Sequence, residues 1–266
     1  MEKVKTIEDV LEVASKYLHE DSLTLIKKAY IIAEEKHQGQ FRKSGEAYVQ
    51  HPLEVAYILA TLHVGPATIA ASLVHDVLED TEMTMDDMKR ELGEDVTSIV
   101  DGVTKISKLK YHTKDKVLAQ NHQKILLAMA KDIRVVLVKL VDRLHNMRTL
   151  QFHDNEEKQK RIAKETLDLY APLANRFGMY QLKAELEDLS LKFISPENYE
   201  EISNKLKEKN SEREDDIINM TNNIKLIYDH IQKDLKAQGW NDEAIAEAIA
   251  EAKKERQATG ADDKTI

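Results

Sequence analysis

Histidine and acidic side chains interrupt the apolar segment ATIAASLVHDVLEDT. We predict a single helix over 66–79, in which residues four apart share a face. That spacing places His75 next to Glu79, and it places Asp76 next to Asp80. Three carboxylates and an imidazole are costly to bury unless a cation or hydrogen-bond donors compensate them. The segment is therefore a candidate functional site.

Two further segments place polar residues within apolar helical patterns. In RVVLVKLVDRLHNMRTL, Asp142 interrupts the apolar run, and Asn146 follows one helical turn later on the same face. In VQHPLEVAYILATL, His51 directly precedes Pro52 at the start of a predicted helix. Both segments are candidates to complete the same site.

Together these segments supply a donor set of two imidazoles and two carboxylates: His51, His75, Asp76 and Asp142. Because the chain has no cysteine, the set favours a hard divalent cation such as Mn²⁺ or Mg²⁺ over a structural zinc ion. Such a cation lowers the pKa of a coordinated water molecule. Glu79 and Asp80 would then position that water or transfer protons.

Each of these residues also has a purely structural interpretation. His51 could cap its helix, Asp142 could pair with Arg143, and the acidic pair could be solvated charge at a helix end. A second His-Asp dipeptide at 153–154 lies in the polar run QFHDNEEKQK, where both side chains can stay solvated. We favour the metal site because the anomalies occur together in a chain whose polar and apolar faces are otherwise well separated.

The elements that must position these residues are helices. The 266 residues include only eight Gly and four Pro, and 33% are charged. A β-sandwich or barrel needs many more turn residues, so we predict an all-α fold. The absence of cysteine excludes disulfides, thiolate nucleophiles and cysteine zinc sites.

Charge and hydropathy limit the partners and the location. A net charge of −9 does not suit a general nucleic-acid binder. No stretch reaches the roughly 18 apolar residues of a membrane helix, and the N-terminus lacks the apolar region of a signal peptide. We therefore expect a cytoplasmic protein with neither a nucleic-acid nor a membrane partner.

Apolar periodicity predicts helices over 7–18, 22–37, 52–63, 66–79, 85–92, 94–106, 117–131, 133–149, 156–176 and 179–193. Thr6 and Thr84 each precede an acid by three residues, which is the capping-box pattern. Residues 38–50 form a predicted loop with adjacent basic residues and glycines, and the lysine-rich stretch 105–116 has little periodicity.

The character of the chain changes after Pro196, where dense alternating charge is typical of an exposed or partner-seeking helix. We expect a domain over 1–195 and a charged helical extension over 196–266. The extension could mediate homo-oligomer formation, since helices with few apolar anchors gain stability from a partner.

Six segments resemble, in the same order, blocks of the hydrolase domain of the RelA/SpoT family, the enzymes of the alarmone (p)ppGpp. They are HQGQFRKSGEAYVQHPLEVAYILA, HDVLEDT, VDGVTKISK, LLAMAKDIRVVLVKLVDRLHNMRTL, ETLDLYAPLANRFGM and LKAELEDLSLKFISPENY. The resemblance runs from about residue 25 to about residue 215. It implies an HD-domain helical bundle, the fold of a superfamily of metal-dependent phosphohydrolases.

The resemblance also implies roles for individual residues. The metal-binding positions of the family, which hold one Mn²⁺ per site, correspond to His51, His75, Asp76 and Asp142. The acidic pair that orients the attacking water corresponds to Glu79 and Asp80. The nucleotide-binding positions correspond to Arg42, Lys43, Ser44, Asn146 and Thr149.

The implied reaction is hydrolysis of the 3′-pyrophosphate of (p)ppGpp to pyrophosphate and GDP or GTP, which ends stringent-response signalling. Residues 217–266 match no synthetase motif, so the chain resembles a stand-alone small alarmone hydrolase, with a truncated longer enzyme as the alternative. Two other functions stay open. The same site could act on another purine nucleotide, such as ppApp or NADPH, or the chain could be a non-catalytic helical binding module.

Overall fold

The computed structural model describes residues 4–107, 132–237, 239–241, 243–244 and 246–247. In these residues all extended regular structure is helical, apart from an isolated bridge between Phe41 and Ala47. The all-α prediction is therefore confirmed. Contacts divide the chain into two compact units, Met1–Tyr199 and Glu200–Ile266.

The first unit contains α1 (Ile7–Ser15), α2 (Glu20–Lys36), α3 (Gln50–Thr61), α4 (Pro66–Leu73), α5 (Val77–Asp80), α6 (Met85–Ser107), α8 (Ile133–Arg148), η1 (Leu150–Phe152), α9 (Glu156–Glu165), η2 (Thr166–Tyr170), α10 (Ala171–Arg176) and α11 (Tyr180–Ile194). Each predicted helix within the described residues overlaps one of these. The helix predicted over 117–131, and most of the lysine-rich stretch, lie outside the described residues.

Both predicted capping boxes are present. The Asp9 amide donates to Thr6 Oγ1 at 3.3 Å, and the Thr6 amide donates to Asp9 Oδ2 at 2.8 Å. Thr84 and Asp87 exchange the corresponding bonds at the start of α6. A kink at Gly93, whose φ is 85°, separates the two helices predicted on either side of it, because this left-handed conformation favours glycine.

The single helix predicted over 66–79 is wrong. The chain leaves the helical path after Leu73, and His75 and Asp76 lie in a turn before α5 begins at Val77. The His75 ring donates from Nδ1 to the Ser72 carbonyl at 2.7 Å, a bond that stabilises the turn. The predicted stacking of His75 on Glu79 along one helix is therefore replaced by a bend.

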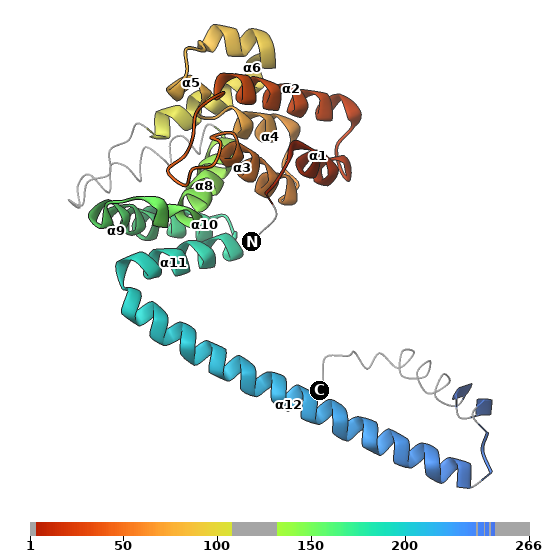
Figure 1. Cartoon of the computed structure of the whole chain (residues 1–266). Helices are drawn as coiled ribbons and strands as arrows, with labels where there is room; N and C mark the ends of the chain where they lie inside the picture. The colour runs from red at the N-terminus through yellow and green to blue at the C-terminus, as the bar shows by residue number, and fades with distance from the viewer. Residues whose placement is uncertain (1–3, 108–131, 238, 242, 245, 248–266) are drawn as a thin grey trace. The chain divides into compact units, whose positions relative to one another are not determined.

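Helix α8 lies at the centre of the first unit. It packs against α3, α4 and α6 on one side and against α11 on the other (Figure 1). Its apolar side chains Leu140, Val141 and Met147 are fully or almost fully buried. A helix held on both sides is a rigid support, and it carries Asp142 and Asn146.

Helices α6 and α8 approach closely at Gly102. A Cβ atom there would lie 2.5 Å from Cγ2 of Val135, a stiff β-branched side chain. We expect Gly102→Ala to lower the free energy of unfolding by about 1–3 kcal/mol, as overpacking does. Urea denaturation measures the change. The control is Gly65→Ser, at a helix N-cap where a Cβ atom would have no described atom within 4 Å, and it should not be destabilised. Equal stability of Gly102→Ala and the unaltered chain would contradict the prediction.

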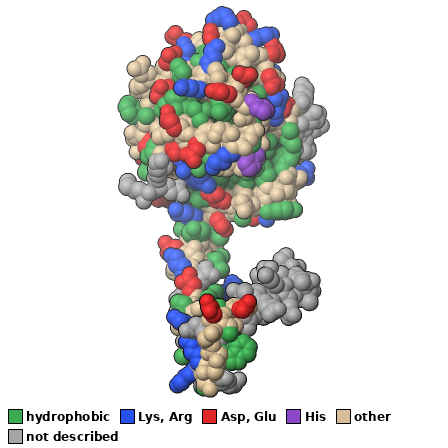
Figure 2. Space-filling model, turned by 90° about the vertical axis from the view of Figure 1, so that its right-hand side faces the viewer, with side chains coloured by type: hydrophobic (Ala, Val, Ile, Leu, Met, Phe, Trp, Pro, Cys, Tyr) green, Lys and Arg blue, Asp and Glu red, His purple; other side chains and the backbone are tan. Residues whose placement is uncertain are grey.

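The helix α12 (Pro196–Ala237) starts within the last residues of the first unit. From Glu200 onward it belongs to the second unit and makes up most of the described residues there. Apolar side chains such as Ile217 and Met220 are exposed along it. Figure 2 shows acidic and basic side chains interspersed over the face of the chain that is turned toward the viewer. Among the described helices, none is both long enough and apolar enough to cross a membrane.

Candidate metal centre and adjoining cavity

Three buried side chains from different parts of the fold converge beside α8. His51 comes from α3, His75 from the turn after α4, and Asp142 from α8; their ligand atoms all lie within 4.8 Å of one another. Asp142 Oδ1 lies 3.2 Å from His51 Nε2 and 3.7 Å from His75 Nε2. Two imidazole nitrogens and a carboxylate oxygen at this spacing could hold a divalent cation.

The fourth predicted ligand, Asp76, lies at the edge of this cluster. Its Oδ2 atom is 3.2 Å from His75 Nε2 and 3.7 Å from His51 Nε2, and its side chain is 25% exposed. The structure thus brings together all four residues of the predicted donor set. Asp76 lies on the solvent side, whereas the other three are buried.

His75 provides a test of whether a cation fits this cluster. Since Nδ1 donates to the Ser72 carbonyl, the neutral ring has its lone pair on Nε2, which faces the two carboxylates. Among the described residues, this buried Nε2 has no hydrogen-bond partner. An unsatisfied buried nitrogen is unusual, and a bound cation would satisfy it.

The carboxylates of Asp76 and Asp142 need positive charge nearby. Burial alone would raise the pKa of Asp142, but Lys139 and the two histidines outweigh burial and hold it well below its usual range. Burial alone would lower the pKa of His75, but Asp76 and Asp142 raise it to about 10. The Asp142 shift keeps this carboxylate charged, and the His75 shift reflects the negative potential of the two carboxylates at Nε2, where a bound cation would replace the proton.

Hydrogen bonds fix the Asp142 carboxylate. Lys139 donates from Nζ to Asp142 Oδ2 at 2.7 Å and to Ser107 Oγ at 2.9 Å. Asn146, one turn along α8, donates from Nδ2 to Asp142 Oδ1 at 2.6 Å. The predicted shared face of Asp142 and Asn146 is therefore present.

The acidic pair lies on α5, next to the cluster, and both side chains are exposed. The Tyr48 hydroxyl is within donating distance of Asp80 Oδ2, at 2.8 Å, and of Asp76 Oδ2, at 2.9 Å. Burial and these two carboxylates raise the pKa of Tyr48 far above its usual value, so it remains a donor. Sequence reasoning missed Tyr48, which links the acidic pair to the cluster.

A cavity of about 300 Å³ adjoins the cluster and shares Asp142 with it. All five residues predicted to bind a nucleotide line this cavity: Arg42, Lys43, Ser44, Asn146 and Thr149. Ser44 donates to Glu46 Oε2 at 3.0 Å, and Arg42 donates from Nη2 to Asn146 Oδ1 at 2.6 Å. The loop before α3 and one face of α8 therefore both contribute to the wall of this cavity.

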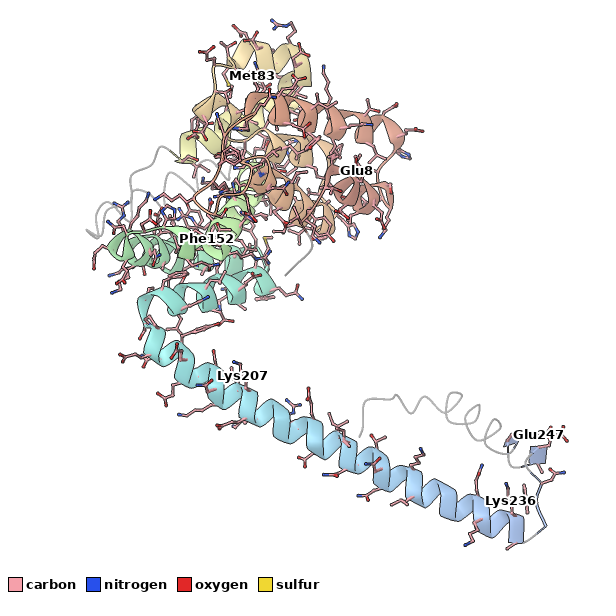
Figure 3. All side chains as sticks on the ribbon, viewed as in Figure 1. Glu8, Met83, Phe152, Lys207, Lys236 and Glu247 are labelled. Atoms are coloured by element: carbon pink, nitrogen blue, oxygen red, sulfur yellow. The ribbon has the colours of Figure 1, made fainter. Side chains whose placement is uncertain are left out.

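Several further residues that the sequence did not indicate also line the cavity. Phe152, labelled beside α9 in Figure 3, and Lys158 are two of them. Another, His153, was expected to be solvated, but its Nδ1 atom is buried, with no hydrogen-bond partner among the described residues. The neighbouring Asp154 side chain is 92% exposed, as expected. No spacing rule finds these residues, because the fold brings them to the cavity.

A helical domain that buries two histidines and an aspartate around a possible cation site belongs to the class of HD-type metal-binding domains. The model of the HD domain family matches residues 29–180 of this chain. The chain belongs to the HD domain family, and the predicted resemblance to the RelA/SpoT hydrolase domain is confirmed.

The curated relatives carry names from alarmone metabolism. A GTP pyrophosphokinase of Myxococcus xanthus is 50% identical over 203 residues, which are 75% of this chain and 27% of that protein. A guanosine-3′,5′-bis(diphosphate) 3′-pyrophosphohydrolase of Haemophilus influenzae is 47% identical over 74% of this chain and 29% of that protein. The bifunctional (p)ppGpp synthase/hydrolase SpoT of Escherichia coli is 44% identical over 75% of this chain and 28% of that protein. The chain thus spans between a quarter and a third of the length of these relatives.

A solved structure extends the comparison to the fold. It is of a metazoan orthologue of SpoT that hydrolyses ppGpp, and it is 26% identical to this chain. The superposition has a TM-score of 0.51 and covers 65% of this chain and 95% of that protein.

Proposed function

We propose that this chain is a guanosine-3′,5′-bis(diphosphate) 3′-pyrophosphohydrolase, which converts (p)ppGpp to pyrophosphate and GDP or GTP and so ends stringent-response signalling. One observation carries the proposal: a buried His-His-Asp cluster adjoins a cavity whose lining includes Lys and Arg side chains. The names of the relatives, and the ppGpp hydrolysis stated for the structural neighbour, support the choice of substrate.

The cofactor in this proposal is one Mn²⁺ ion, held by His51, His75, Asp76 and Asp142. When bound, the ion supplies Lewis-acid polarisation and makes a water molecule easier to deprotonate. The hydrogen bond of His75 to the Ser72 carbonyl and the bonds of Asp142 to Lys139 and Asn146 hold the ligand atoms in place.

The cavity binds the nucleotide. The planar guanidinium of Arg42 offers a stacking surface for the purine, and Ser44 offers a donor and an acceptor to its edge. Asn146 on α8 and Thr149 at the C-cap of that helix contact the nucleotide. Lys43 and Lys158 line the same cavity and contribute the positive charge that a substrate with two diphosphates requires.

The acidic pair carries the proton transfers. A water oxygen attacks the phosphorus atom attached to the ribose O3′, a new P–O bond forms, and the P–O3′ bond breaks. Asp80, with Glu79 beside it on α5, orients the water and accepts its proton. Tyr48 keeps the Asp80 carboxylate next to Asp76. Asp80 then passes this proton to the leaving O3′, which completes GDP or GTP and pyrophosphate and returns Asp80 to its carboxylate form.

Product analysis tests this function. The 266-residue chain is incubated with ppGpp and Mn²⁺, and the products are separated by chromatography, with an EDTA-treated sample as the control. We expect GDP and pyrophosphate in equal amounts, and none after chelation. Parallel incubations with ppApp and NADPH test the alternative that a stacked arginine accepts any purine. Absence of turnover with all three substrates, despite Mn²⁺ binding, would support the non-catalytic binding module instead.

We also propose a cytoplasmic location, a domain boundary near residue 195 and self-association through the helical extension over 196–266. Light scattering after size-exclusion chromatography compares the full chain with a 1–195 fragment. A dimeric full chain and a monomeric fragment are expected. The same number of chains per particle in both samples would contradict a role for the extension in self-association.

A further inference from the structure

His145 lies between the nucleotide cavity and the metal cluster, where it contacts Arg42 of the cavity and His51 of the cluster. It follows Asp142 by three residues on α8, so the two side chains share a face of that helix. The ring is 9% exposed, and its centroid lies 4.8 Å from that of the His51 ring. We infer that His145 is a positioning residue, which fixes the ring of His51 so that its Nε2 lone pair faces the cation. This inference rests on the proposed metal site.

Nδ1 of His145 lies within hydrogen-bond distance of two other nitrogen atoms, one from His51 and one from Arg42. Nδ1 of His145 lies 2.8 Å from Nδ1 of His51 and 3.2 Å from Nη1 of Arg42. A guanidinium has N–H donors and no acceptor. Nδ1 of His145 is therefore the acceptor in the bond from Arg42, and it carries no proton.

The same acceptor determines the proton position on His51. Because Nδ1 of His145 has no proton, the hydrogen in the short contact between the two rings belongs to Nδ1 of His51. A neutral imidazole with a proton on Nδ1 has its lone pair on Nε2. That atom of His51 is the one that lies 3.2 Å from Asp142 Oδ1.

The two histidines of the cluster are thus oriented by hydrogen bonds to different kinds of acceptor. His75 donates to a backbone carbonyl, as noted above, whereas His51 donates to another side chain. Partners that fix the outer nitrogen of a ligating histidine typically contribute 10–100-fold to metal affinity. Arg42 completes the arrangement: it bonds to His145 and to Asn146, which in turn bond to His51 and Asp142.

The test measures Mn²⁺ affinity of the full-length chain by calorimetry. Asparagine at 145 presents its Oδ1 near the place of the imidazole Nδ1, so H145N keeps an acceptor there, whereas H145L removes it. We expect H145L to bind Mn²⁺ about 10–100-fold more weakly and H145N to remain within about threefold of the unaltered chain. The matched control is Leu144→Met, a volume-conserving change at the adjacent buried position, which should leave the affinity unchanged.

A second readout follows the proton itself. Long-range ¹H–¹⁵N NMR of the metal-free chain should show the His51 proton on Nδ1 in the unaltered protein and in H145N. In H145L, part of the population should move to Nε2. Circular dichroism confirms that each variant is folded.

Three results would overturn the inference. They are equal Mn²⁺ affinity in H145L and the unaltered chain, an affinity of H145N as low as that of H145L, or a His51 proton that stays on Nδ1 in H145L. Failure of the proposed function is distinguishable, since it would appear as an unaltered chain that binds Mn²⁺ and does not hydrolyse ppGpp.

Discussion

Replacing Asp80 by Asn is expected to lower kcat for ppGpp hydrolysis by about 10²–10⁴-fold, the usual contribution of a positioned acid or base. An amide cannot accept the proton of the attacking water, whereas it keeps the size of the carboxylate and an oxygen to accept the Tyr48 bond. Asp80 is not among the four proposed ligands of the cation, and its Oδ2 atom accepts from the Tyr48 hydroxyl instead. The Mn²⁺ affinity should therefore stay within about threefold of that of the unaltered chain. Loss of a residue that hydrogen-bonds to a metal ligand has a larger effect, typically 10–100-fold.

Steady-state kinetics and calorimetric Mn²⁺ titration of the same preparation check both halves of this result. Asp86→Asn provides the control, because it makes the same chemical change on an exposed residue at the start of α6. Its kcat should equal that of the unaltered chain. An active Asp80→Asn enzyme would exclude Asp80 as the proton acceptor, and a simultaneous loss of Mn²⁺ binding would make it a ligand instead.

Replacing Asp142 by Asn is expected to abolish both metal binding and hydrolysis. Asp142 is the buried carboxylate of the cluster, and its Oδ1 atom lies 3.2 Å from His51 Nε2 and 3.7 Å from His75 Nε2. A cation at 100 times its Kd raises the free energy of unfolding by about 2.7 kcal/mol, and this increment should disappear in the variant. The rate should fall by at least about 10³-fold, because without the metal the attacking water loses the lowered pKa, and the phosphoryl oxygens lose the Lewis-acid polarisation, that the ion would supply.

Urea denaturation with and without Mn²⁺ measures the increment. Asparagine keeps a carbonyl oxygen facing Lys139, so the metal-free variant should remain folded. The unaltered chain in the presence of EDTA is the reference. Like the variant, it should show no metal-dependent increase in the free energy of unfolding. An Asp142→Asn protein that Mn²⁺ stabilises as strongly as the unaltered chain would contradict the proposed ligand set.

Local sequence signals predicted much of this fold because the features they report are local. The capping residues Thr6 and Thr84 satisfy amides of their own helices, and Gly93 bends its own backbone. The candidate ligands were visible because charged side chains within apolar segments demand an explanation. The resemblance to a known family added their order along the chain.

The features that were missed depend on contacts between distant segments. The turn at His75 has neither glycine nor proline to mark it, and its side chain is oriented by a carbonyl of the preceding helix. Tyr48 and His145 become meaningful only when α3, α5 and α8 are packed together. His153 was placed in solvent because the residues around it in the chain are polar, whereas its Nδ1 atom is buried in the fold.

Helix α8 has one more consequence, which concerns substrate length. Asp142 lies on α8 and Thr149 is the C-cap residue seven positions later, so at 1.5 Å per residue the two are about 10 Å apart along the axis. Helices on both sides hold α8, so this spacing is fixed. In the proposed function, α8 therefore sets the distance between the metal site at Asp142 and the nucleotide-binding position at Thr149. A nucleotide binds productively only if its base and its 3′ phosphates occupy both positions at the same time. A nucleotide without a 3′ substituent is too short to do so.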